Sequence, residues 1–228
     1  MKNTFGLNGG VKLGCRRNAS GVPYLSSQLF SPPVHLSKPY FDEDTGSLLV
    51  NLSCPTAGLL AGDRMVCDIE ISDEASMVVT TPGATRSHFM RSGIARVEQR
   101  LKIKEGSFLE FNPGALILQK ATNLEQISEV EIDEDAEILF VEKILPGRIA
   151  HGESFVFQKF SNQLRIKREN QLVLLESFVL NPLTESTLPW KNSFPAPYYA
   201  SFYLLSPKLK EHLPSRDRIH GMTGPNLL

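Results

Sequence analysis

The chain has 228 residues, 41% of them hydrophobic, so it is long enough to bury a sizeable core in one domain. Its 24 Lys and Arg residues nearly balance its 25 Asp and Glu residues, which removes the electrostatic argument for binding nucleic acid or an anionic membrane. It lacks both an apolar run of the roughly 18 residues that a membrane-spanning helix needs and the apolar stretch of a signal peptide. Because its three cysteines show no paired spacing, we expect a soluble cytoplasmic protein.

The first 53 residues predict two strands, at 10–15 and 48–52, with a loop-rich span between them. Four prolines lie in this span, and proline cannot donate a hydrogen bond to a sheet. We therefore expect no central strand between the two predicted ones.

A loop with two glycines, Gly58 and Gly62, precedes the first strongly patterned segment. Glycine in such a loop indicates a backbone position with positive φ or with a close neighbour. An alternating apolar segment at 66–71 then leads through an acidic turn to a Val- and Thr-rich run at 77–81. Alternation followed by β-branched residues predicts a β-hairpin, which ends at Pro82-Gly83.

This unit recurs about every 30 residues as an apolar-charged-apolar triplet, a short polar turn and a second apolar run. The triplets are 32, 29 and 34 residues apart and begin at Ile69, Leu101, Val130 and Leu164. Pro-Gly follows the second run in three units, whereas the weaker fourth unit has 172–175 as its second run and then Asn181-Pro182. The period predicts a solenoid-like stack in which each unit buries its apolar face on its neighbours, with an ordinary β-sandwich as the alternative.

We therefore predict one mainly β domain over residues 1–228, with hairpin repeats at about 64–182 and one or two short helices near the C-terminus. A strand is expected at 198–205, and Ser206-Pro207 can open a helix that runs to about Leu213. The last ten residues resemble the start of a strand without a partner, so we expect the domain to be truncated at its C-terminus.

Eight acidic residues and no basic residue lie between Lys120 and Lys143. This run could form an acidic docking face or a path for a cation, but alternation with Val130 and Ile132 favours the solvated face of a strand. The basic segment 165–168 is interpreted in the same way.

Motifs for catalysis are absent: the sequence has no P-loop, no G-x-S-x-G and no paired Cys/His spacing. The five histidines are scattered, with no spacing suited to one metal ion. Cys54 and Cys67 flank Asp63, where a soft-metal site is the alternative to buried structural cysteines. Threonines around Pro82-Gly83 could orient a ligand or satisfy the backbone of a turn. We predict that the protein is not an enzyme.

Several segments, in order, carry a resemblance. Residues 55–64 (PTAGLLAGDR) and 80–86 (TTPGATR), with the basic Arg91, are similar to the glycine-rich and TT-x-x-AT-K segments of the urease accessory protein UreD (UreH) family. The similarity continues through 109–113 and 140–148 and covers about residues 10–205. Ala61 replaces a family glycine and Arg86 a usual lysine. The family-motif positions are Gly58, Gly62, Asp63, Thr80, Thr81, Pro82, Gly83, Ala84, Thr85, Arg86, Pro146, Gly147 and Arg148.

The resemblance implies a non-catalytic, solenoid-like urease maturation factor. Such proteins bind the helical accessory protein UreF, through it the GTPase UreG, and apo-urease, so that nickel can be inserted; no nucleic acid or membrane partner is expected. No cofactor is bound tightly, and nickel in transit would need weak oxygen or imidazole contacts. Candidates for such contacts are Asp63, His88, Glu142 and His151. The alternative is a β-solenoid enzyme or binding module for a carbohydrate-type ligand, which would need carboxylates or a histidine clustered on one exposed face.

Overall fold

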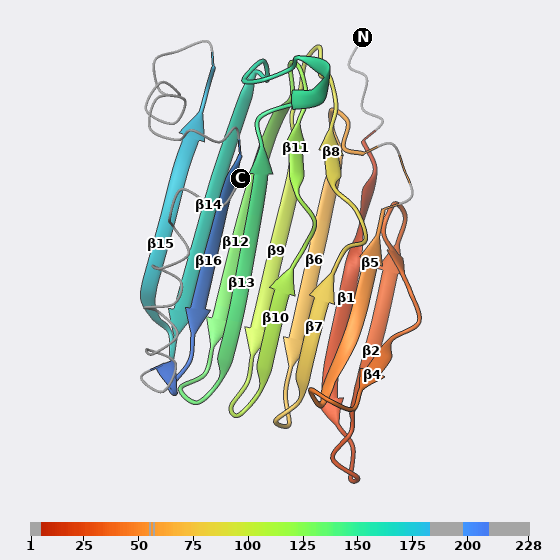
Figure 1. Ribbon diagram of the computed structural model, residues 1–228, viewed down its shortest axis with the longest axis vertical. Coiled ribbons are helices and arrows are strands. Elements are labelled where there is room, and N and C mark those ends of the chain that lie inside the picture. Colours follow the sequence, from red (N-terminus) through yellow and green to blue (C-terminus); the bar gives the residue numbers. More distant parts are fainter. Residues whose placement is uncertain (1–5, 55, 57, 183–197, 210–228) are drawn as a thin grey trace, which may run out of the picture.

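The computed structural model describes residues 6–54, 56, 58–182 and 198–209, and these form two facing β-sheets (Figure 1). Sheet I has the order β15-β14-β12-β9-β6-β1-β2. Its strands are β1 (Asn8–Arg17), β2 (Pro23–Ser31), β6 (Arg64–Ile71), β9 (Ala95–Ile103), β12 (Asn123–Ile132), β14 (Lys159–Arg168) and β15 (Gln171–Leu180).

Sheet II has the order β3-β5-β7-β10-β13-β11-β8, with β4 beside β5 and β16 beside β13. Its strands are β3 (His35–Leu36), β4 (Tyr40–Asp42), β5 (Ser47–Ser53), β7 (Ser76–Thr80), β8 (Thr85–Ser87), β10 (Phe108–Asn112), β11 (Leu116–Leu118), β13 (Glu137–Leu145) and β16 (Tyr199–Leu205). The predicted strand at 198–205 is therefore confirmed.

The two strands of each repeat lie in different sheets. β6 pairs in parallel with β1 and β9, whereas β7, which follows it in the chain, pairs in parallel with β5 and β10. The next two repeats behave in the same way, with β9 and β12 in sheet I and β10 and β13 in sheet II. The predicted solenoid-like stack is confirmed, but the hairpin pairing within each unit is wrong: each unit is an arch whose strands pair with the neighbouring units.

The turn between the strands explains why arches form. Four residues separate the strands in each arch, at 72–75, 104–107 and 133–136. Facing sheets lie about 10 Å apart, twice the spacing of paired strands, so the chain needs these residues to change sheet. The last residue of each turn is small and fully buried: Ala75, Ser107 and Ala136. Neighbouring arches are joined by backbone hydrogen bonds, such as Lys104 N–H to the Ile71 carbonyl (2.9 Å).

The fourth repeat differs from the prediction in two ways. β14 and β15 pair with each other in sheet I, because only Glu169 and Asn170 separate them, and both have positive φ (48° and 65°), as in the tight turn of a hairpin. The segment 172–175 therefore does not cross to sheet II. The register is also shifted by two residues, since Val130 lies beside Ile166 instead of Leu164.

An additional layer of the stack precedes the first predicted repeat. Leu13 of β1 lies beside Ile69, and Leu48 of β5 lies beside Met77, so both strands occupy repeat positions. The two predicted N-terminal strands fall within β1 and β5. Part of the proline-containing span forms β2, an edge strand that begins at Pro23.

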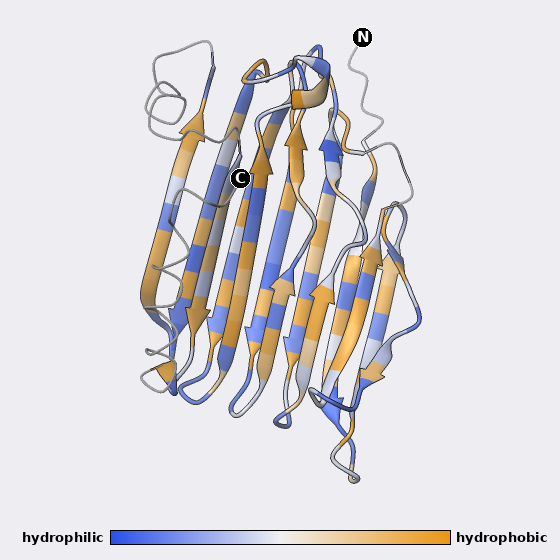
Figure 2. Cartoon of the chain, in the orientation of Figure 1, coloured by the Kyte–Doolittle hydropathy of each residue, from blue (hydrophilic) through white to orange (hydrophobic). Residues whose placement is uncertain are grey.

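The core lies between the sheets, where equivalent residues of successive layers stack. Ile71, Ile103 and Ile132 occupy one such row and are all at most 2% exposed. Phe111 and Phe140 stack with their ring centroids 5.6 Å apart. Burying each such side chain contributes about 1.5–3 kcal/mol. Figure 2 shows the corresponding alternation of hydrophilic and hydrophobic residues along the strands of sheet I.

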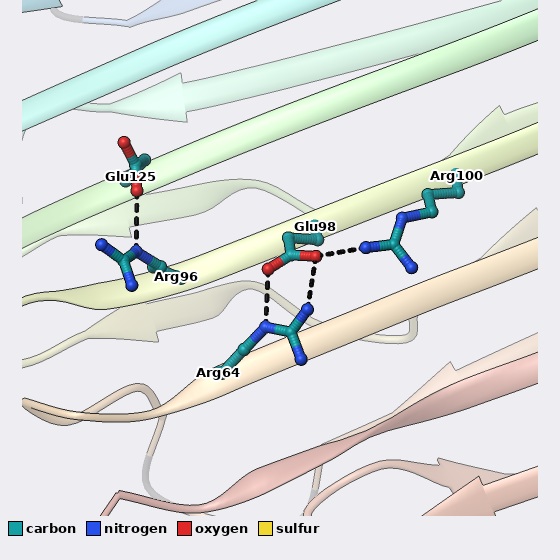
Figure 3. A network of polar contacts seen from close by, with 5 residues as sticks. All are labelled: Arg64, Arg96, Glu98, Arg100 and Glu125. Carbon is teal, nitrogen blue, oxygen red and sulfur yellow. Dashed lines mark hydrogen bonds and ion pairs between the residues drawn. The ribbon is translucent and has the colours of Figure 1, made fainter.

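The outer face of sheet I carries ion pairs between neighbouring strands. The Arg64 guanidinium makes two hydrogen bonds to Glu98 (2.6 and 2.7 Å), which also accepts one from Arg100 (Figure 3). The acidic run is divided between the two sheets. Glu125 and Glu131 face outward on β12 and pair with Arg96 and Lys102, whereas Glu142 lies in β13 of sheet II.

Helix is scarce in the described part of the chain. A short 3₁₀ helix, η1 (Ile149–His151), follows β13. The Ser206 hydroxyl accepts a hydrogen bond from Lys208 N–H (3.0 Å), as expected of an N-cap, but the rest of the predicted helix to Leu213 lies outside the described residues. No helix within the described ranges has the length and apolar character needed to cross a membrane.

Candidate functional site

Sheet II is interrupted where two Pro-Gly pairs occur. Residues 81–84 separate β7 from β8, and residues 113–115 separate β10 from β11, so the short strands appear as separate arrows in Figure 1. β13 continues across the same level: β10 pairs with it up to Phe140 and β11 pairs from Ile144 onward. The stretch of β13 between these two ladders contains Glu142.

The geometry of the break depends on one of the two glycines. The Thr81 hydroxyl accepts a hydrogen bond from Gly114 N–H (2.7 Å) and donates one to the Gly83 carbonyl (2.9 Å). A Cβ atom on Gly114 would lie 2.1 Å from that carbonyl oxygen, whereas a Cβ on Gly83 would meet no atom of the described residues within 4 Å. Only Gly114 is therefore required by the close approach of the two segments.

Gly58 brings a third segment against the break. Its φ is 135°, and a Cβ atom at this position would lie 2.1 Å from the Arg86 carbonyl oxygen, so larger residues are excluded. This approach lets Leu59 N–H donate to the Arg86 carbonyl (2.7 Å) while the Leu59 carbonyl accepts from His88 N–H (2.9 Å). Gly62 also has positive φ (90°), so the prediction of special backbone positions at both glycines is confirmed.

Behind the break, a cavity of about 360 Å³ lies between the sheets. Sheet I contributes residues from β6, β9 and β12, among them Cys67, Gln99 and Gln126. Sheet II contributes Glu142 and Lys143, together with the segment 81–86 and Pro113-Gly114. The structure thus gathers seven of the predicted family-motif positions around one cavity: Gly58, Thr81, Pro82, Gly83, Ala84, Thr85 and Arg86.

The cavity wall contains a buried carboxylate held by two amides. Glu142 is 4% exposed and accepts hydrogen bonds from Gln126 Nε2 (2.8 Å) and Asn162 Nδ2 (3.1 Å). Beside it, the Ser128 hydroxyl donates to Gln99 Oε1 (2.8 Å). These amides were not among the predicted site residues. Gln126 and Ser128 share the inward face of β12 with buried leucine and isoleucine residues, and this break in an apolar row is the signal that could have revealed them.

Burial raises the pKa of Glu142 to about 7, although the hydrogen bonds from Asn162 and Gln126 favour the charged form. The negative charge of Glu176 on β15 adds to the rise. Glu176 in turn accepts hydrogen bonds from the hydroxyls of Tyr199 (3.1 Å) and Tyr203. Near neutral pH the Glu142 carboxyl can therefore gain or lose a proton.

Comparison with known proteins adds the decisive observation. A protein-family model described as the UreD urease accessory protein matches residues 7–224. This chain belongs to the UreD urease accessory protein family. It is 36% identical over 168 residues to the urease accessory protein UreD of Opitutus terrae, an alignment that covers 74% of this chain and 62% of that protein.

Two further relatives agree with this family. The urease accessory protein UreH of Helicobacter hepaticus is 28% identical over 180 residues, which cover 79% of this chain and 71% of the relative. The urease accessory protein UreD of Brucella suis is 35% identical over 138 residues, which cover 60% of this chain and 50% of the relative. The alignments with this UreD-family chain therefore span between 50% and 71% of the length of these relatives.

The four predicted nickel contacts lie on separate elements of this UreD-family chain. Asp63 is buried, and its carboxylate oxygens accept hydrogen bonds from the N–H groups of Leu7 and Leu60 (both 2.8 Å). His88 follows β8, and His151 is exposed in η1. Within the described ranges, no three His, Cys, Asp or Glu side chains are grouped so that they could hold a metal ion. Glu142 alone among the four lines the cavity.

The motif positions Gly147 and Arg148 lie against Glu153, and the cysteines Cys54 and Cys67 lie at the cavity. Arg148 Nε donates to Glu153 (2.9 Å), and a Cβ on Gly147 would lie 2.4 Å from the Glu153 carbonyl oxygen. Cys54 and Cys67 both line the cavity, but burial raises the pKa of Cys67 to about 12. At neutral pH the Cys67 thiol is therefore protonated unless a metal ion displaces its proton.

Proposed function

We propose that this UreD-family chain is a non-catalytic urease maturation factor. In this role it links apo-urease to a UreF-like helical accessory protein and, through that protein, to a UreG-like GTPase, and it acts in the cytoplasm without nucleic acid or membrane partners. Family membership supports the urease role. A second part of the proposal is that nickel, as cargo, passes through the cavity behind the break in sheet II on its way to urease.

The proposal that nickel passes through the cavity rests on the surroundings of Glu142. It is a buried carboxylate on the wall of the cavity, and in the described part of the chain its hydrogen-bond partners are the neutral amides of Gln126 and Asn162. In its ionised form, which competes with protonation near neutral pH, this carboxylate attracts a cation strongly because the dielectric constant around it is low. A single carboxylate does not form a closed coordination sphere, so an ion held there can move on.

The alternative of a carbohydrate-type enzyme or binding module has no comparable support. It needs carboxylates that are free on one exposed face. Along the outer face of sheet I and its turns, five carboxylates (Asp68, Glu98, Glu125, Glu131 and Asp133) are paired with a lysine or arginine. The two exposed ones on the strands of this face that form no ion pair among the described residues, Glu70 and Glu129, lie on β6 and β12 with β9 between them, so they do not form a cluster.

The test is to co-express the full chain with its cognate UreF-like protein, UreG-like GTPase and apo-urease. Urease activity, urease nickel content and co-purification are measured for the wild type, for Glu142→Gln and for the control Glu129→Gln, which lies on the exposed face of β12. We expect Glu142→Gln to retain co-purification but to lower nickel content and activity at least about tenfold, the usual size of such effects at metal sites. The control should match the wild type.

The two parts of the proposal fail separately. Urease activity that does not depend on the chain at all would overturn the maturation role. Full activation by a folded Glu142→Gln variant would overturn the nickel passage and leave the linking role in place.

A further inference from the structure

The outer face of sheet I changes character at β14 and β15. From β1 to β12, basic side chains on this face are ion-paired, for example with a neighbouring strand in Lys12–Asp68 and Arg96–Glu125 and within one strand in Arg100–Glu98. β14 carries three exposed basic residues and no acidic residue: Lys159, Arg165 and Lys167. In the part of the chain that the structure describes, none of these three forms an ion pair.

The acidic residues on the neighbouring strand leave this basic row largely uncompensated. Glu129 and Glu131 of β12 lie in register with Arg165 and Lys167. Glu131, however, pairs with Lys102 on the other side (3.1 Å), and Glu125 pairs with Arg96 (2.8 Å). Within the described residues, Glu129 is therefore the only one of these three carboxylates that is not already engaged by a basic residue of β9.

An apolar row lies directly beside the basic one. On β15, Val173, Leu175 and Val179 are 52%, 54% and 48% exposed, and Leu172 is 54% exposed. Leu175 is in register with Arg165, and Leu172 with Lys167. Edge strands usually carry lysine or proline on such positions, because an exposed apolar edge invites contact with other chains. The sequence of β15 has neither.

We infer that the outer face of β14 and β15 is the docking surface for an amphipathic helix of a partner protein, with an apolar stripe flanked by acidic residues. A helix fits because its diameter of about 10 Å covers two strands spaced about 4.8 Å apart. A helix also places an apolar stripe next to a charged one, whereas successive residues of an extended strand face opposite ways. This surface is separate from the cavity and does not depend on the passage of nickel.

Charge argues against a second copy of the chain as the occupant. Two copies that met face to face through β14 and β15 would bring one basic row close to the other, and like charges repel. An acidic helix neutralises the row instead and covers the exposed leucine and valine side chains in the same contact.

The test uses the full chain and two synthetic helical peptides with the same leucine stripe, one flanked by glutamates and one by lysines. Binding is measured by fluorescence anisotropy for the wild type, for the double variant Arg165→Glu/Lys167→Glu and for Leu175→Asn. The matched control is Leu29→Asn on β2, an outward residue that is 69% exposed on the opposite edge of the same sheet. Circular dichroism confirms that each variant is folded.

We expect the glutamate peptide to bind at least tenfold more tightly than the lysine peptide, and to bind more weakly as salt is raised. Both variants on β14 and β15 should weaken the binding of the glutamate peptide at least tenfold, whereas Leu29→Asn should leave it unchanged. Equal binding of the two peptides, no binding of either, or unchanged binding by the variants would overturn the inference. Two other results would also overturn it, if neither peptide bound. One is binding of the chain to phosphatidylserine vesicles that the β14–β15 variants abolish. The other is self-association of the chain in sedimentation experiments that the same variants abolish.

Discussion

The two sheets are built by the same repeating arches, yet they differ in continuity. In sheet I, β6, β9 and β12 run without interruption and pair over 8 to 10 residues with each neighbour. In sheet II, β7 and β10 stop after 5 residues, and the chain resumes as β8 and β11 beyond a Pro-Gly pair. Continuous pairing gives a closed wall, whereas the interrupted strands leave the space that becomes the cavity. One repeat can therefore supply both a scaffold and a site.

The largest effect on stability should come from adding one methyl group at the break in sheet II. Gly114→Ala places a Cβ 2.1 Å from the Gly83 carbonyl oxygen, so the two segments must separate. We expect the free energy of unfolding to fall by about 3 kcal/mol or more. Gly83→Ala, whose Cβ meets no described atom within 4 Å, is the matched control and should stay within about 0.5 kcal/mol of the wild type. Urea denaturation of both variants measures the difference, and equal losses would contradict this account of the break.

The stability of the protein should depend on pH through Glu142, the buried carboxyl on the cavity wall. Because the folded state raises the pKa of Glu142 to about 7 from 4.5, it holds this proton more tightly than the unfolded state does. Stability should therefore be greatest below the unfolded value, fall as pH rises through this window and level off above pH 7, by at most about 3 kcal/mol.

Glu142→Gln removes that titration. The difference in unfolding free energy between the wild type and the variant should shift in favour of the variant between about pH 4.5 and pH 7. Urea denaturation at several pH values measures it, with Glu129→Gln as the exposed control. A difference that does not change with pH would show that folding leaves the pKa of Glu142 unchanged.

The smallest effect on stability should come from the ion pairs on the outer face of sheet I. Glu98 accepts hydrogen bonds from Arg64 and Arg100 on the outer face of sheet I, and the Arg64 hydrogen bonds lower its pKa. Exposed ion pairs contribute little, so Glu98→Gln should destabilise the protein by less than about 1 kcal/mol. High salt should shrink the loss further. A loss that equals that of Gly114→Ala, or that does not respond to salt, would contradict the comparison of the two sheets.

Much of the stack could be predicted because equivalent residues repeat on one face. Ile69, Leu101 and Ile103 were placed correctly, since a strand that buries one face has little freedom in its alternation. The fourth repeat was placed two residues out of register because Leu164 and Ile166 both point inward, and a shift by two keeps the same face buried. Alternation alone cannot distinguish these registers. The earlier layer at Leu13 was missed because a glycine replaces the charged residue of its triplet.

The candidate site could be predicted only in part. The sequence identified the segment 80–86 and Glu142, but it did not indicate that they meet. The third Pro-Gly pair, Pro146-Gly147, lies past the end of β13, so that strand crosses the level at which the two preceding strands are broken. Three identical dipeptides thus have two different structural consequences. Which consequence follows depends on the length of the strand before each pair, and strand ends are poorly determined by local sequence.

The parallel stacking of the arches also determines how this chain can fold during synthesis. The strands β7, β9, β10, β12 and β13 each pair in parallel with the equivalent strand about 30 residues earlier, so a growing chain can add one layer at a time to those already formed. The antiparallel strand β16 is different, since its partner β13 leaves the ribosome more than 50 residues before it does. Until β16 is made, one side of β13 has no strand beside it. That side is an unpaired strand edge in the nascent protein, and such edges can pair with other chains.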